Sequence, residues 1–315
     1  FEFMPPDEAE KIGEKFKKIV AQKESIKELE NWNISKNGRR VCLLTNGVPV
    51  LDEKSRLLGF RGIDTDITER KIAERRMDGL NCLMEELLKS GSLAEKTKRI
   101  TDGVVDILGA DFARIWLTKH GDLCDAGCIH ASTAEEPHIC RDRSKCLHMA
   151  ASSGRYTHIN GAHGRVPFGC YKIGRVAADL EPGFLTNDVT HDPRVHDHDW
   201  AKDLGLISFA GYRLLSHEGR VLGALALFSK KVLSPGEETL LQTIAKAASE
   251  MIQASLSVKA LLQSEEKNRI LFQFASDAVF VIDTETLNIL DANDAAVKLY
   301  GYGHPEFLQM KITEL

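Results

Sequence analysis

Apolar and polar positions alternate between residues 26 and 68. The alternation is clearest in the runs RRVCLLTNGVPVL and LLGFRGIDTDI, and Asn-Gly and Asp-Glu pairs supply turn signals. Side chains that alternate in this way lie on opposite faces of a strand. The pattern predicts an antiparallel sheet of about three strands in this region.

A helical pattern follows from Ile72, with apolar side chains at intervals of three and four residues between charged ones. A second such run starts after LSPGEE, where Ser234 suits a helix cap and Pro235 the first turn. This spacing is typical of helices that pair with another helix, so we expect a homodimer formed through both helices. The alternative is an amphipathic helix that packs on its own domain. The two seams comprise Ala73, Met77, Leu80, Met84 and Leu87, and Leu241, Ile244, Ala248, Met251, Ser255, Val258 and Leu262.

Between the helical seams, the sequence predicts a mixed α+β domain. A helix is expected in KTKRITDGVVDILG, followed by strands at 111–117, 146–151, 206–215 and 220–229. A new unit with helix, strand, turn, strand and short helices is expected after Ser264.

Composition and charge exclude several classes of protein. Hydrophobic residues make up 43% and charged residues 28%, which is typical of soluble domains. No stretch approaches the ~20 apolar residues that span a bilayer, and FEFMPPDEAE is too acidic for a signal peptide, so we expect a cytoplasmic protein. The net charge of -5 lacks the basic excess of nucleic-acid-binding domains, so we expect no nucleic-acid partner.

Soft metal ligands gather in the segment CDAGCIHASTAEEPHICRDRSKCLH, residues 124–148. Its turn-rich composition offers no helix or sheet to hold the loop at 121–145, and a bound metal would supply folding energy there. The predicted ligands are Cys124, Cys128, Cys140 and Cys146, and His130, His138 or His148 could replace one of them.

Thiolate ligands favour zinc or an iron–sulfur cluster. The CxxC knuckle of many zinc sites and the regular runs of small ferredoxins are absent, so a set of unrelated reduced cysteines remains the alternative. Haem is a further redox cofactor to consider, although the chain has no CxxCH attachment pair.

Three other motifs favour structural roles. Residues 216–220, SHEGR, mimic the phosphoacceptor box of a histidine kinase but join two predicted strands, so we expect a hairpin turn. Residues 191–199, HDPRVHDHD, are irregularly spaced, which favours a solvated or capping loop over a hydrolytic metal site. Cys170 is expected to be a small buried residue before a helix. Without GxxxxGK[ST], GxSxG or HExxH, we predict no catalytic residues.

The flanking segments resemble PAS domains. GFRGIDTDITERK resembles the closing strand and exit of such a domain, where Asp66-Ile67-Thr68 passes the sheet on to a signalling helix. FASDAVFVIDTETLNILDANDAAVKLYGYGHPEFLQMKITEL resembles the opening half of another, including Asn293 and Gly301-Tyr302. Both PAS units look incomplete, as in a piece of a longer sensor.

The middle of the chain resembles a GAF domain, on the segments GFLTNDVTHDPRVHDHDWAKDLG and LISFAGYRLLSHEGRVLGALALFS. The resemblances imply an antiparallel GAF sheet whose helix after Cys170 borders a ligand pocket. They divide the chain into a C-terminal PAS part (1–71), a signalling helix (72–92), a GAF domain (93–255) with a Cys-rich insertion (121–148), a linker helix (256–268) and an N-terminal PAS part (269–315).

The resemblances imply the sensory segment of a bacterial or archaeal signal-transduction protein of the histidine-kinase type. A small ligand or a redox state would be detected by the GAF or PAS domains and relayed along dimeric helices. A response regulator would then be addressed through an output domain outside the chain. The alternatives are the regulatory part of a histidine kinase whose catalytic domains lie outside the chain, and a ligand-free dimerisation scaffold.

Overall fold

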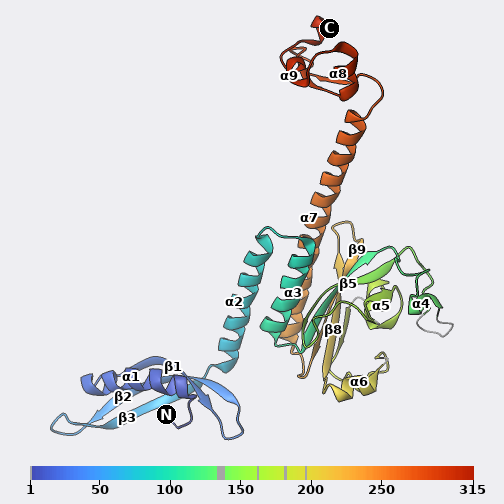
Figure 1. Ribbon diagram of the computed structural model, residues 1–315. Coiled ribbons are helices and arrows are strands. Elements are labelled where there is room, and N and C mark those ends of the chain that lie inside the picture. Colours follow the sequence, from blue (N-terminus) through green and yellow to red (C-terminus); the bar gives the residue numbers. More distant parts are fainter. Residues whose placement is uncertain (1, 133–138, 162, 181–182, 196) are drawn as a thin grey trace.

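Three sheets occur along the chain in the computed structural model, which describes residues 2–132, 139–161, 163–180, 183–195 and 197–315 (Figure 1). The first has the order β1-β2-β3, the second β6-β5-β4-β9-β8-β7, and the third β10-β11. No helix in these described residues is both long and apolar enough to cross a membrane.

The N-terminal sheet confirms the three predicted strands. Helix α1 (Pro6–Gln22) precedes β1 (Ile26–Ile34), β2 (Arg40–Leu51) and β3 (Leu57–Asp66), and adjacent strands run antiparallel. The first hairpin turns through Asn37-Gly38, where Gly38 has a φ of 81°, a region that favours glycine. The other Asn-Gly pair, Asn46-Gly47, lies inside β2.

A compact joint connects β3 to α2 (Thr68–Leu88). The backbone N–H of Cys42 donates to Thr68 Oγ1 at 2.9 Å, and the Thr68 N–H donates to Asp66 Oδ1 at 2.9 Å. Ile67 between them is buried. The predicted exit from sheet to helix therefore lies at Asp66-Ile67-Thr68.

The middle part is a six-stranded antiparallel sheet with helices on both faces. Its first helix, α3 (Leu93–Leu108), begins at a capping box between Ser92 and Glu95, which satisfies N–H groups of the first turn. The strands are β4 (Phe112–Lys119), β5 (Cys146–Gly154), β6 (Arg165–Pro167), β7 (Gly183–Thr186), β8 (Ser208–Leu215) and β9 (Val221–Ser229). The short helices are α4 (Ile129–Ser132), α5 (Tyr171–Ala177) and α6 (His198–Asp203).

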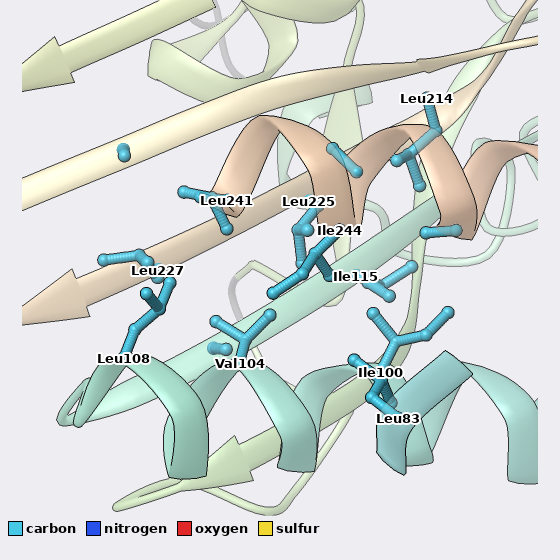
Figure 2. Close-up of a cluster of buried hydrophobic side chains, with 14 of the residues drawn as sticks. Leu83, Ile100, Val104, Leu108, Ile115, Leu214, Leu225, Leu227, Leu241 and Ile244 are labelled. Carbon is cyan, nitrogen blue, oxygen red and sulfur yellow. The ribbon is translucent and has the colours of Figure 1, made fainter. Parts of the chain in front are cut away.

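Helices α2, α3 and α7 (Pro235–Gln273) contribute to the core on one face of this sheet. Figure 2 shows Val104 of α3 and Ile244 of α7 packed with Ile115 of β4. Alternate strand residues point to opposite faces, so Phe112 and Trp116 of β4 belong to a second core on the other face. The sheet thus separates a helix-covered core from a second apolar space.

Most residues of the predicted helix seams pack against other parts of the same chain. Leu80 and Leu87 of α2 are buried against α3 and the sheet, and the first four positions of the α7 seam, Leu241 to Met251, lie in the same core. At these positions the amphipathic-helix alternative is correct. Seam positions are left uncovered at the start of α2, where Ala73 is exposed and Met77 is 55% exposed, and in the later part of α7, with Val258 58% and Leu262 59% exposed.

The C-terminal part confirms the predicted order of helix, strand, turn, strand and short helices. It contains β10 (Phe280–Ile282), β11 (Ile289–Ala292), α8 (Asp294–Tyr300), α9 (His304–Phe307) and a 3₁₀ helix (Ile312–Glu314). Asn293 is fully buried and its amide donates to the carbonyls of Phe272 (3.0 Å) and Asp277 (2.9 Å). Its oxygen accepts from the N–H groups of Val279 and Ala296. One side chain therefore connects the end of α7 to this small sheet.

Candidate ligand-binding pocket

A cavity of about 260 Å³ lies on the face of the large sheet opposite α7. Strand β4 forms its floor, α5 and the region of α6 form walls, and the segment after β5 closes one side. Its lining comprises Arg114, Trp116, Tyr156, His158, His163, Val166, Tyr171, Lys172, Ile173, Val195, Asp197, Trp200, Phe209 and Phe228. Aromatic rings and a few charged groups thus surround the cavity, which is typical of small-molecule sites.

Arg114 brings a positive charge to the floor of the pocket. It is only 8% exposed, and its Nε lies 3.4 Å from Ser152 Oγ. The guanidinium carbon lies 5.1 Å from the ring centroid of Phe112 and 5.3 Å from that of Tyr156, within cation–π range. Burial lowers the pKa of Arg114. No carboxylate of a described residue forms an ion pair with it.

Lys172, in the first turn of α5, supplies a second buried positive charge. Its side chain lies over Phe209 and Phe228, with Nζ 4.6 Å and 5.6 Å from the ring centroids. Burial lowers its pKa to about 8, against the opposing influence of Asp192 and Asp197. In the described part of the chain, Nζ has no hydrogen bond or ion pair, so both cations are available to an occupant of the cavity.

A polar wall joins the pocket to the Cys-rich segment. Trp116 Nε1 donates to the carbonyl of His163 at 2.8 Å, and the Tyr171 ring meets the rings of His163 and His130 edge-on, with centroids 5.4 Å and 5.5 Å apart. Tyr171 has a φ of 51°, a strained value for a residue other than glycine. Burial, reinforced by Arg114, lowers the pKa of His163, which favours its neutral form.

The four predicted metal ligands form no disulfide among the described residues, and their thiols influence one another's pKa. Cys146 lies buried on β5, where burial and then the Cys140 and Cys128 thiols raise its pKa to about 12. Burial and then Cys124 and Cys128 raise the pKa of Cys140. Among the residues that the structure describes, however, no three His, Cys, Asp or Glu side chains are grouped as metal ligands. Metal binding by these cysteines therefore stays a prediction.

The alternative histidine ligands lie in different surroundings. His148 follows Cys146 on β5 and its Nε2 is buried with no hydrogen-bond partner in the described chain, while Nδ1 lies 3.7 Å from Asp122 Oδ2. Burial, reinforced by Arg165, lowers the pKa of His148. His130 Nε2 lies 3.1 Å from the carbonyl of Arg165. His138 lies outside the described residues.

The other motifs take the expected structural roles. Residues 216–220 form the hairpin turn between β8 and β9, with Gly219 at a φ of 77°. Asp197 caps α6 by accepting from the Trp200 N–H at 2.9 Å, and His191 pairs with Asp188 at 2.7 Å. Cys170 is buried at the start of α5, the helix that borders the pocket.

Arg114 and Lys172 were not identified as site residues from the sequence. The available signal was a charge inside a largely apolar run: Arg114 is the single charge in FARIWL, and Lys172 shares YKIGRVA with Arg175. Such a charge acquires meaning only when its whole element is known to be buried.

The comparisons with known proteins identify the domains. A family model described as a GAF domain matches residues 92–252, just over half of the chain, and two models described as PAS domains match residues 1–69 and 266–315. The chain is 24% identical over 267 residues to the Methyl sulfide methyltransferase-associated sensor of Methanosarcina acetivorans. That match covers 84% of this chain and 25% of the relative, so the chain spans about a quarter of its relative's length.

Similar solved structures include the GAF domain from an Acinetobacter phosphoenolpyruvate-protein phosphotransferase, with 18% identity, a TM-score of 0.43, and coverage of 59% of this chain and 97% of the other. Another is the free methionine-R-sulfoxide reductase from Neisseria meningitidis, with 17% identity, a TM-score of 0.44, and coverage of 60% and 93%. The order of the matching domains is the one expected from the sequence. The chain belongs to the GAF domain family, and PAS domain matches flank its GAF domain on both sides.

Proposed function

We propose that the GAF domain senses a small molecule in the pocket beside β4 and that α7 relays its binding to the C-terminal PAS segment. The observation that supports this most strongly is the pair of buried cations, Arg114 and Lys172, which face the cavity without a carboxylate partner among the described residues. An unpaired buried charge costs stability, so its presence in a cavity favours a binding role.

The relay would pass through the sheet. Arg114 faces the pocket, while its neighbour Ile115 faces the core formed with α3 and α7. Helix α7 is fixed to the β8–β9 hairpin, because Ser249 Oγ accepts from the Leu215 N–H at 3.1 Å and Gln253 Oε1 from the His217 N–H at 2.9 Å. A change in strand position would therefore alter how α7 packs.

A screen of small metabolites by thermal unfolding of the whole chain tests this function. A ligand that binds only the folded state raises the unfolding temperature. We expect stabilising compounds whose effect disappears in a Val195→Phe variant, because the added ring would fill part of the cavity. Compounds that stabilise the variant as much as the wild type would act outside the pocket and contradict the proposal.

We further propose that two copies pair through residues 256–273 of α7, and that a response regulator receives the signal through an output domain outside this chain. The uncovered seam positions of α7, Val258 and Leu262, lie beyond the GAF core, and Leu261 beside them is 60% exposed. Apolar side chains at coiled-coil spacing are stabilised by a second helix.

Leu262→Asp is expected to shift the chain from dimer to monomer in analytical ultracentrifugation, because pairing would bury an unpartnered charge. Ser264→Asp is the matched control, since Ser264 points away from Leu262 on the same exposed stretch. If the wild type and both variants sediment with one mass, pairing through this seam is excluded. Leu80 and Met251 are unsuitable positions for this test because both are buried in the intrachain core.

We also propose that Cys124, Cys128, Cys140 and Cys146 form one zinc or iron–sulfur site. Two observations support it: the thiols interact electrostatically, and His148 Nε2 beside Cys146 is buried with no partner in the described chain. Convergence of the ligands would accompany metal binding, as in other small metal sites.

Replacing any one of these four cysteines by serine is expected to remove most of the bound metal and to expose the 121–145 loop to protease. Cys42→Ser and Cys82→Ser, outside the cluster, should retain the metal. Elemental analysis and an absorption spectrum of anaerobically purified protein distinguish colourless zinc, a coloured cluster and haem. A metal-free, protease-resistant protein from metal-replete cells would refute the site.

A further inference from the structure

We infer that the pocket takes a planar aromatic anion whose carboxylate or phosphate group is bound jointly by Arg114 and Lys172. This inference rests on the proposed sensory function and specifies the chemistry of the ligand. It follows from the free donors, the engaged neighbouring carboxylates and the aromatic lining.

The two cations have donors to offer. Among the described residues Arg114 forms one hydrogen bond, from its Nε to Ser152 Oγ, so its terminal nitrogens have no partner there, and neither does Lys172 Nζ. Both side chains lie on aromatic faces and line the cavity. Guanidinium and ammonium groups recognise carboxylates and phosphates through charge-assisted hydrogen bonds.

The nearby carboxylates are engaged elsewhere. Asp192 accepts two hydrogen bonds from Arg194, at 2.9 Å and 2.8 Å, and Asp197 caps α6 through the Trp200 N–H. Burial also favours the neutral form of His163 by lowering its pKa. Two cations, Arg114 and Lys172, thus face one lining carboxylate, Asp197, which leaves the cavity with a net positive character that disfavours a cationic ligand.

The remaining surface is suited to a flat ring. Trp116, Tyr156, Trp200, Phe209 and Phe228 all line the cavity, and Trp200 and Phe228 meet edge-on with centroids 5.5 Å apart. Aromatic side chains bind aromatic ligands by stacked and edge-on contacts. The volume of about 260 Å³ lies below the ~300–1,000 Å³ of drug-sized sites, which restricts the ligand to a small molecule.

Matched acids and amides test the inference on the whole chain. Phenylacetate, phenyl phosphate and phenylacetamide are titrated by calorimetry and by tryptophan fluorescence, in a Trp32→Phe background that leaves Trp116 and Trp200 of the pocket as reporters. We expect at least one of the acids to bind and the amide to bind more weakly. Comparison of the two acids shows whether carboxylate or phosphate is preferred.

The cation variants supply the sharper contrast. Arg114→Met and Lys172→Met should each weaken binding of the acid about 10- to 100-fold, because each removes a charge-assisted contact in a buried site. Arg114→Lys should retain part of the affinity. Lys246→Met, at an exposed position on the GAF part of α7, is the control and should bind like the wild type.

Three results would overturn the inference. If the amide binds as tightly as the acids, or if the acids bind both cation variants as tightly as the wild type, the pocket recognises only the ring, and the sensory function would stand. If none of the three compounds binds, simple aryl anions are excluded. The metabolite screen then decides the sensory function separately, because its hits would need only the open cavity that Val195→Phe fills.

Discussion

Lys172→Met is expected to stabilise the unliganded chain by about 3 kcal/mol near neutral pH, because each unit of pKa shift corresponds to about 1.4 kcal/mol. Burial lowers the pKa of Lys172 from an ordinary 10.5 to about 8. Below pH 8 the folded protein carries a buried charge that the unfolded chain holds in water. Removing the charge while keeping an apolar side chain relieves that cost.

The pH dependence gives the sign of the effect. Between pH 8 and 10.5 the unfolded chain binds the proton more tightly than the folded one, so the wild type gains stability as the pH rises. The advantage of Lys172→Met should thus be complete below pH 8 and shrink towards pH 10.5. Urea unfolding at several pH values measures it, with Lys246→Met as the exposed control. A variant less stable than the wild type at pH 7 would show that burial of the Lys172 charge does not destabilise the folded protein.

Glu237→Ala is expected to lower the free energy of unfolding by about 1–3 kcal/mol, because it removes the charge-assisted hydrogen bonds to Arg76 and Lys231 and the carboxylate of the α7 capping box. Glu237 lies in the first turn of α7, is 4% exposed, and its carboxylate oxygen Oε1 lies 2.6 Å from Arg76 Nη2 and 3.0 Å from Lys231 Nζ. Oε2 accepts from the backbone N–H and the hydroxyl of Ser234. Arg76 belongs to α2, so this pair fixes the helix leaving the N-terminal PAS segment to the start of α7.

The loss of stability at low pH shows whether the ionised Glu237 carboxylate causes the expected effect. Burial raises the pKa of Glu237, but the hydrogen bonds from Ser234 and Lys231 outweigh it and the net pKa is lowered. The ionised carboxylate therefore stabilises the fold above pH 4.5, and this contribution is lost as the pH falls through the lowered folded value. Glu250→Ala, at an exposed position of α7 before the proposed pairing segment, serves as control. Equal unfolding curves for the Glu237 variant and the wild type would rule out the role given to this pair.

The sequence predicted those features that depend on local pattern. Strands β1 to β3 follow from alternation, β4 and β9 from short apolar runs, and the joint at Thr68 from a motif confined to a few residues. The α7 seam shows what such patterns cannot predict. Its spacing indicates a buried face, yet Met251 packs in the chain's own core, whereas Leu262 is exposed to solvent. Periodicity predicts that a side chain is buried, but it does not identify the surface against which that side chain packs.

The pocket could not be predicted because its members are brought together only by tertiary structure. Arg114 comes from β4 and Lys172 from α5, and the aromatic rings around them come from several further elements. The cysteines are the opposite case, because they are close in sequence and their thiols do interact. Spacing alone leaves the presence of a metal undecided.

Hydrogen exchange of the whole chain, with and without the tightest ligand from the metabolite screen, tests the central claim most directly. Occupancy of the pocket should slow amide exchange in α5 and also change exchange along α7, both in the core-packed part at 241–252 and in the exposed part at 256–273. The Val195→Phe variant should show neither response to the ligand. Slower exchange in α5 with no change anywhere along α7 would contradict the claim that the GAF pocket signals through this helix.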